Sequence, residues 1–177
     1  MTLSTVLEGV ALTLLGDAET GLSMTDKGIE MYQGITAPTM WPLILHLRGL
    51  VHSYSGHPDR GLALIDEAVA LVGSDDFPDI WISRGDVMRL LPAPDLEGAE
   101  GWYRDAIEAA NAKRLRTHEL RAWTRLVDLT RAQGVSPDGS DELRAVCDTF
   151  TEGFDEHDLA KARTVFGLDP VGATSPR

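Results

Sequence analysis

Apolar side chains recur at intervals of three and four residues along most of the chain. Between Ala18 and Tyr32, for example, they include Leu22, Ile29 and Tyr32 itself. This spacing gathers them on one face of an α-helix, whereas a half-buried strand would need strict alternation of apolar and polar residues. No alternating stretch of useful length is present in the sequence. The pattern therefore predicts an all-α protein.

Glycine and proline mark where one predicted helix ends and the next begins. Gly16, Gly56 and Gly134 each follow an apolar period, where glycine closes a helix in the left-handed conformation. Pro42 and Pro58 suit the first turn of a helix, where the missing N–H costs nothing. These signals predict helices over residues 3–14, 18–32, 42–54, 58–72, 79–91, 96–112, 116–133 and 141–150, and a short last helix from 155 to about 166.

The chain also repeats itself after forty residues. Segment 16–22 (Gly-Asp-Ala-Glu-Thr-Gly-Leu) returns as segment 56–62 (Gly-His-Pro-Asp-Arg-Gly-Leu). The match includes Gly9 with Gly49 upstream and Asp26 with Asp66 downstream. An internal period of this size is typical of a helical repeat array, in which each helical hairpin buries its apolar face against its neighbours.

Two further copies are looser. In the third copy, Arg84-Gly85 matches Arg48-Gly49 and Ala106 matches Ala68 after a short insertion, which groups the fifth and sixth predicted helices as a hairpin. The fourth copy keeps a first helix that ends at Gly134 and a second helix from Asp141. Glycine inside a helix costs up to about 1 kcal/mol relative to alanine. Glycines that recur at matched positions despite this cost indicate helices that cross too closely for a larger side chain. We predict a right-handed α-solenoid of about four helical hairpins plus a short C-terminal helix, forming one domain over residues 1–166. Residues 167–177 lack the period and are predicted to be a flexible tail.

The spacing of these small residues carries a resemblance to a known family. The pattern Gly49-x6-Gly56-x4-Gly61-x6-Ala68 resembles the small positions of the tetratricopeptide repeat. In tetratricopeptide arrays the first helix of each hairpin, helix A, lines the concave face. The resemblance implies that a peptide or partner domain binds in a groove lined by His46, Leu50, Tyr54, Ile82, Asp86, Arg89, Arg121, Thr124, Asp128 and Arg131. A plain solvated face without a ligand is the alternative.

A narrower resemblance is to the helical C-terminal region of large bacterial signalling ATPases, which often carry a nucleotide cyclase or a transcriptional regulator domain. It lies in residues 56–68, in residues 118–122 (His-Glu-Leu-Arg-Ala) and in residues 150–155 (Phe-Thr-Glu-Gly-Phe-Asp). The sequence contains no phosphate-binding loop of the Gly-x4-Gly-Lys-Ser/Thr type and no cyclase domain. The resemblance therefore implies a regulatory helical segment without the ATPase or cyclase activity.

Composition narrows the choice of partner. The net charge of −12 opposes binding to the phosphate backbone of nucleic acids or to an anionic membrane. No apolar run reaches the roughly 18 residues of a membrane span. The single cysteine, Cys147, excludes an intramolecular disulfide, and the N-terminus lacks the features of a signal peptide. We expect a cytoplasmic protein whose partner is a protein or peptide, or a second copy of the chain.

Residues that could carry chemistry do not form a known catalytic or metal-binding motif. His46 and His52 are six residues apart, which places them on different faces of a helix, so the two side chains cannot converge on one metal ion. Cys147 lies on an apolar stripe with Leu143 and Phe150, as a structural thiol does. We predict a protein that is not an enzyme and holds no metal and no cofactor.

The sequence therefore predicts a non-catalytic interaction or regulatory module that binds its partner through the groove formed by the A helices. Two alternatives stay open. The chain could be a detached C-terminal sensor or oligomerisation segment of an ATPase- or adenylate-cyclase-type signalling regulator. It could also be a small-molecule-binding helical domain.

Overall fold

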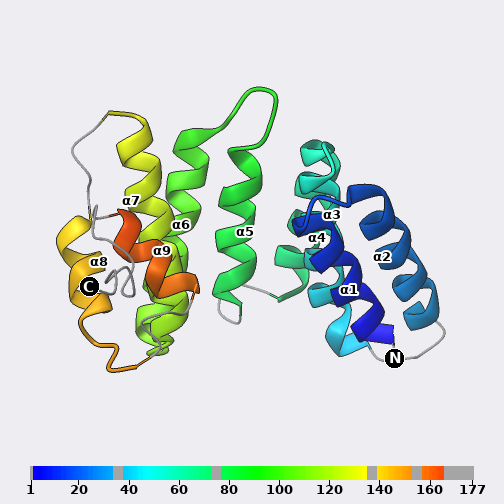
Figure 1. Ribbon diagram of the computed structural model, residues 1–177, viewed down its shortest axis with the longest axis horizontal. Helices are drawn as coiled ribbons and strands as arrows, with labels where there is room; N and C mark the ends of the chain where they lie inside the picture. Colours follow the sequence, from blue (N-terminus) through cyan, green and yellow to red (C-terminus); the bar gives the residue numbers. More distant parts are fainter. Residues whose placement is uncertain (1, 34–37, 73–76, 135–138, 153–156, 166–177) are drawn as a thin grey trace, which may run out of the picture. The chain divides into compact units, whose positions relative to one another are not determined.

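The computed structural model describes residues 2–33, 38–72, 77–134, 139–152 and 157–165, and every regular element within these ranges is a helix (Figure 1). This confirms the all-α prediction. The elements are α1 Thr2–Leu14, α2 Ala18–Gln33, the short 3-10 helix η1 Pro38–Met40, α3 Trp41–Tyr54, α4 Pro58–Val72, α5 Pro78–Met88, α6 Leu96–Ala112, α7 Arg116–Ala132, α8 Ser140–Cys147 and α9 His157–Val165.

Two helices end three residues earlier than predicted. The fifth helix was expected to reach Leu91 but ends at Met88, because a residue before proline is disfavoured in the helical conformation and Pro92 follows Leu91. The eighth ends at Cys147 rather than Phe150. The predicted tail, the start of the last predicted helix and residues 153–155 of the signalling-ATPase motif lie outside the described residues.

The chain divides into two compact units, Met1–Asp95 and Leu96–Arg177. Helices α1 to α5 belong to unit 1 and helices α6 to α9 to unit 2. The single domain expected from the sequence spans both units. In unit 1, α1 packs along α2 and α3 packs along α4, while α3 also contacts α1, α2 and α5. Helix α3 is therefore the centre of unit 1.

The same kind of turn joins the two helices within each hairpin of unit 1. The Asp17 N–H donates a hydrogen bond to the Leu12 carbonyl at 2.9 Å, and forty residues later the His57 N–H donates to the His52 carbonyl at 2.9 Å. Gly16 and Gly56 precede these donors with φ of +96° and +87°, in the region that favours glycine. This confirms the helix-closing role predicted for the two glycines.

The two helices of each hairpin in unit 1 cross at a pair of glycines, one from each helix. A Cβ atom added to Gly61 would lie 2.5 Å from the Gly49 carbonyl oxygen, and one added to Gly21 would lie 2.7 Å from the Gly9 oxygen. Next to the crossing, the Ser53 hydroxyl donates to the Gly49 carbonyl at 2.8 Å. The helices thus meet backbone to backbone, and the small residues of the repeat are a requirement of this packing.

A repeated ion pair joins each hairpin to the next A helix. Asp26 on α2 accepts from Arg48 on α3 at 2.9 Å, and Asp66 on α4 accepts from Arg84 on α5 at 2.6 Å. Both acids and both arginines occupy matched positions of the sequence repeat. The repeat therefore continues through α5, which takes the place of a third A helix.

A double-mutant cycle on Asp66→Asn and Arg84→Gln should give a small coupling energy. The pair is partly exposed, so we expect about 0.2–1 kcal/mol in low salt. The coupling should shrink in 1 M salt, where the screening length falls to about 3 Å. Urea unfolding of the four proteins measures it, and a coupling that does not change with salt would contradict a direct ion pair.

In unit 2, α7 is the central helix. It packs along α6 and also contacts α8 and α9. The core contains Leu120, Val127, Leu143, Val146, Leu159 and Ala162, all buried. The sequence grouped α6 with the preceding helix as a third hairpin, whereas the helix that packs along α6 within its unit is α7.

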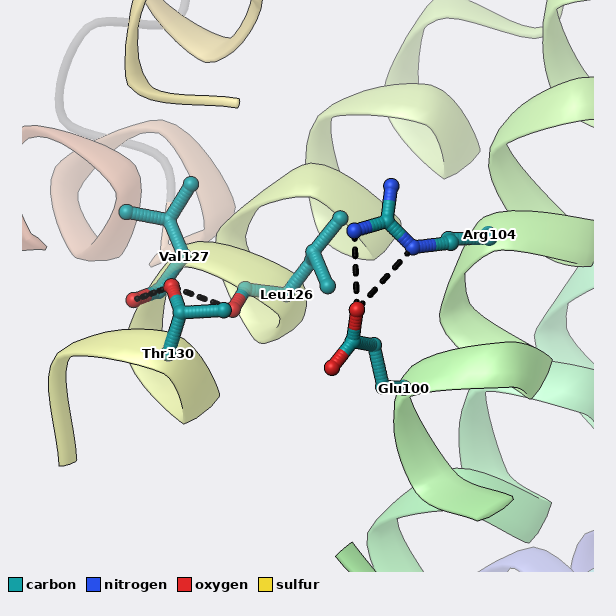
Figure 2. Close-up of polar contacts among 5 residues, drawn as sticks. All are labelled: Glu100, Arg104, Leu126, Val127 and Thr130. Carbon is teal, nitrogen blue, oxygen red and sulfur yellow. Dashed lines mark hydrogen bonds and ion pairs between the residues drawn. The ribbon is translucent and has the colours of Figure 1, made fainter. Parts of the chain in front are cut away.

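The repeated ion pair changes in unit 2. Arg104 on α6 occupies the position of Asp26 and Asp66, counted from the match of Ala106 with Ala68. A guanidinium cannot take the acceptor role of these two aspartates, and Arg104 instead donates to Glu100 in its own helix at 2.8 Å (Figure 2). Figure 2 also shows the buried Thr130 of α7, whose hydroxyl is satisfied by the carbonyls of its preceding turn.

Candidate functional site

The repeat register places three exposed apolar side chains at equivalent positions of unit 1. Leu14, Tyr54 and Leu90 lie at or just past the C-terminal ends of α1, α3 and α5. Their exposed fractions are 63%, 43% and 44%. Large apolar side chains are usually covered in a soluble fold, so their repetition at one register position marks a candidate binding surface. We call these three residues the A-helix row.

Helix α3 contributes a narrow accessible stripe to this surface. Between Ile44 and Tyr54, the only residues with appreciable solvent access are Arg48, Leu50 and Tyr54. The Arg48 guanidinium is bound to Asp26 of α2. Leu50 and Tyr54 are four residues apart and share one face of the helix. The stripe that they form is the apolar face that α3 presents to solvent.

The sequence-predicted site residues of unit 1 separate into buried and accessible ones. Tyr54 is exposed, and Leu50, Asp86 and Arg89 are half-buried. His46 and Ile82 are buried. These two side chains therefore contribute to packing rather than to an open surface.

His46 links α3 to α5. Its Nε2 atom lies 2.8 Å from the Ser83 hydroxyl, at hydrogen-bond distance. Burial lowers the pKa of His46 from 6.5 to about 4, and the Asp79 carboxylate offsets only part of this effect. The imidazole is therefore neutral near pH 7, as a structural hydrogen-bonding group would be.

The sequence-predicted site residues of unit 2 lie on α7. Arg121 donates to the carboxylate of Asp158 on α9 at 2.6 Å. Thr124 is buried, and its hydroxyl donates to the Leu120 carbonyl at 2.6 Å. Asp128 is half-buried and Arg131 is exposed. Arg121 and Thr124 are thus engaged within their unit, and Arg131 is the most accessible of the four.

Leu14 and Leu90 were not among the site residues predicted from the sequence. Both follow from Tyr54 by the repeat offsets, forty residues back and thirty-six residues forward. The groove was instead inferred from the resemblance, beginning at the third helix. Extending the register of Tyr54 to the first and fifth helices would have identified the complete A-helix row.

Two further titratable groups are shaped by burial. His52 is buried, neither ring nitrogen has a hydrogen-bond partner within the described residues, and its pKa is lowered by burial and by Arg60 and Arg48. Cys147 is half-buried against the core of unit 2, and burial raises the pKa of its thiol. A thiol that stays protonated is a weak nucleophile, which favours a structural role for Cys147.

Within residues 2–33, 38–72, 77–134, 139–152 and 157–165, no three histidine, cysteine, aspartate or glutamate side chains are gathered in a way that could hold a metal ion. Among the helices that were described, none is both long enough and apolar enough to span a membrane.

No protein-family model matches the chain, and no curated protein is significantly similar to it.

Proposed function

We propose that the chain is a non-catalytic interaction module whose A-helix row binds apolar side chains of a peptide or partner domain. The carrying observation is the repetition of exposed apolar residues at one register position, in Leu14, Tyr54 and Leu90. Tyrosine is enriched among the side chains that contribute most to the affinity of protein interfaces, and contiguous exposed apolar surface is typical of interaction sites. Val10 and Leu50, one turn earlier on α1 and α3, extend the apolar surface.

We further propose that the helices form a tetratricopeptide-like, right-handed solenoid. Three repeated features support this architecture for unit 1. They are the shared turn at Gly16 and Gly56, the glycine crossings of the two hairpins, and the ion pairs from each hairpin to the next A helix. The proposed solenoid of about four hairpins extends the same arrangement through unit 2, in a protein that works in the cytoplasm.

A second exposed apolar pair lies on the B helices, the second helices of the hairpins, and is a weaker candidate. Met31 on α2 and Leu71 on α4 also occupy equivalent positions, with exposed fractions of 42% and 54%. The residues one turn before them are Lys27 and Glu67, both exposed. Charged neighbours would have to be desolvated or paired when a partner covers this pair. The A-helix row has apolar neighbours at two of its three positions and avoids most of that cost.

The test compares substitutions in the A-helix row with matched substitutions on the B helices. The partner is captured from the cell of origin, identified and purified, and its affinity for each variant is measured by calorimetry. We expect Leu14→Ser, Tyr54→Ser and Leu90→Ser each to weaken binding about 10-fold or more, since anchors contribute about 2 kcal/mol. The controls Met31→Ser and Leu71→Ser should change the affinity less than about 3-fold, a shift of well under 1 kcal/mol.

Two outcomes would count against this site. Loss of binding in the Met31 and Leu71 variants alone would move the interface to the B helices. Unchanged binding in all the A-helix variants would exclude the row as an anchor. Sedimentation of the purified chain identifies the case in which the partner is a second copy, and the same substitutions should then dissociate the oligomer.

A further inference from the structure

Unit 2 contains a pocket of about 370 Å³ that is open to solvent between α6, α7 and α8. Three charged side chains line it, those of Arg116, Glu119 and Glu142. The side chains of Ile107, Asn111 and Trp123 are also part of the lining. All of these residues belong to one unit. The pocket is unrelated to the A-helix row, so an inference about it does not rest on the proposed function.

The turn between α6 and α7 has the same hydrogen bond as the turns of unit 1. The Leu115 N–H donates to the Ala110 carbonyl at 2.8 Å, as Asp17 and His57 do in the turns of unit 1. Arg114, with φ of +57°, occupies the left-handed position that Gly16 and Gly56 hold there. Counted from this turn, and not from the sequence match of Ala106 with Ala68, α6 takes the place of the first helix of a unit 1 hairpin and α7 the place of the second.

In this comparison, large side chains of α6 and α7 occupy the positions at which the glycines of unit 1 cross. Ile107 takes the position of Gly49, and Glu119 takes that of Gly61. In unit 1 the same place has no room for even a Cβ atom. Helices that carry isoleucine and glutamate there cannot meet backbone to backbone. The space where the unit 1 helices touch corresponds to part of the pocket lining in unit 2.

The wall of the pocket is fixed by Trp123. A Cβ atom on Gly139 would lie 2.6 Å from Cε3 of the indole, so the ring packs directly against the backbone at the start of α8. Gly139 also has φ of +86°, a conformation that other residues rarely adopt. The indole is thus held in one place by a position that requires glycine.

The charges favour a positive ligand. The Glu119 side chain is only 7% exposed, and its Oε2 atom accepts from Arg116 Nη1 at 2.6 Å, while the Arg116 side chain is 47% exposed. Glu142 adds a second carboxylate in the first turn of α8. Two carboxylates and one guanidinium line the pocket, and Glu119 accepts one hydrogen bond from Arg116 although a carboxylate has about four acceptor positions. The indole face of Trp123 also attracts cations.

We propose that this pocket binds an organic cation, a guanidinium or alkylammonium group, between the Glu119 and Glu142 carboxylates and the Trp123 ring. The cation competes with Arg116 for Glu119, and the exposed Arg116 side chain is able to turn toward solvent. The aliphatic stem of the ligand lies against Ile107. The cation is either a free amine or a basic side chain of a peptide, because both present the same chemistry.

Calorimetry on the full chain at low ionic strength tests the proposal with two probes. Agmatine supplies a free guanidinium, and a blocked Gly-Arg-Gly peptide supplies the same group on a backbone. We expect binding of one or both, weakened about 10-fold or more by Glu119→Gln and about 2- to 5-fold by Glu142→Gln, whose carboxylate is more exposed. Arg116→Gln should strengthen binding, because it removes the competing cation.

The Glu100–Arg104 pair provides matched controls in the same unit (Figure 2). Glu100→Gln and Arg104→Gln make the same charge changes outside the pocket lining, and they should leave the affinity within about 2-fold. Stronger binding of agmatine identifies a free amine as the ligand, and binding of the peptide alone identifies a basic segment. Thermal melting shows whether Glu119→Gln folds, and Arg116→Gln decides the outcome independently if it does not.

Three results would overturn the proposal. The first is that neither probe binds to the wild-type protein. The second is that Arg116→Gln abolishes binding of agmatine or the peptide instead of strengthening it. The third is that acetate or inorganic phosphate binds and Arg116→Gln removes that binding, which would make the pocket an anion site.

Discussion

Acidification from pH 7 to pH 4 should remove about 3 kcal/mol of stability through His46 alone. The pKa of this histidine is about 4 in the folded protein, against its ordinary value of 6.5 in an unfolded chain. A difference of one pKa unit corresponds to about 1.4 kcal/mol. Because His46 is buried in contact with Ser83 and neutral, protonating it requires either unfolding or a charge inside the packed interface.

The direction of this effect follows from proton uptake. Between pH 6.5 and pH 4 the unfolded chain carries the proton and the folded protein does not, so a falling pH favours the unfolded state. Above pH 6.5 both states are neutral and the stabilising contribution is complete. The lowered pKa of His52 acts in the same direction.

Urea unfolding at pH 7, 6, 5 and 4 measures this loss. His46→Gln should flatten the dependence on pH by about 3 kcal/mol across the series, whatever its stability at pH 7. His157→Gln, at an exposed position on α9, is the matched control and should preserve the wild-type slope. Equal slopes for wild type and His46→Gln would show that His46 is not held neutral by burial.

Gly61→Ala should lower the free energy of unfolding by about 2 kcal/mol. The new methyl group would lie 2.5 Å from the Gly49 carbonyl oxygen, against a backbone that cannot yield cheaply. Overpacking of this kind costs about 1–3 kcal/mol, and here the upper end applies because the obstacle is backbone. The gain in helix propensity from glycine to alanine, up to about 1 kcal/mol, offsets only part of it.

Gly101→Ala is the control with the opposite sign. Gly101 lies inside α6, and a Cβ atom there meets nothing within 4 Å. The substitution should therefore stabilise its helix by up to about 1 kcal/mol. Thermal and urea unfolding of the two variants test the crossing directly. A Gly61→Ala protein as stable as wild type would mean that the helices of this hairpin do not meet at the glycines.

Local signals account for the parts of the fold that the sequence predicted. Apolar periodicity located the helices, and Gly16 and Gly56 located the turns, because each depends on residues close in the chain. The small residues of the repeat were also informative, since a close crossing leaves no alternative to them. The grouping of the helices after α5 into hairpins was inferred from weaker matches, such as Ala106 with Ala68, and such matches do not decide which neighbour α6 packs along.

The candidate site was only partly predictable, for a related reason. Tyr54 and Leu50 were inferred from the resemblance to the tetratricopeptide repeat, and both have access to solvent. His46 lies on the same helix but is covered by α5, and covering depends on neighbours that periodicity does not describe. The pocket of unit 2 was missed because Glu119 looked like an ordinary helical glutamate until its burial was known.

Photo-crosslinking from single positions is the most direct test of the A-helix row as the binding surface. A benzoylphenylalanine is placed at position 54, or at position 71 as the control, and the chain is irradiated in the cell that makes it. Both positions are exposed, on α3 and α4 of the same hairpin. The proposed surface predicts a discrete crosslinked product from position 54 and none from position 71. A product from position 71 alone would contradict it.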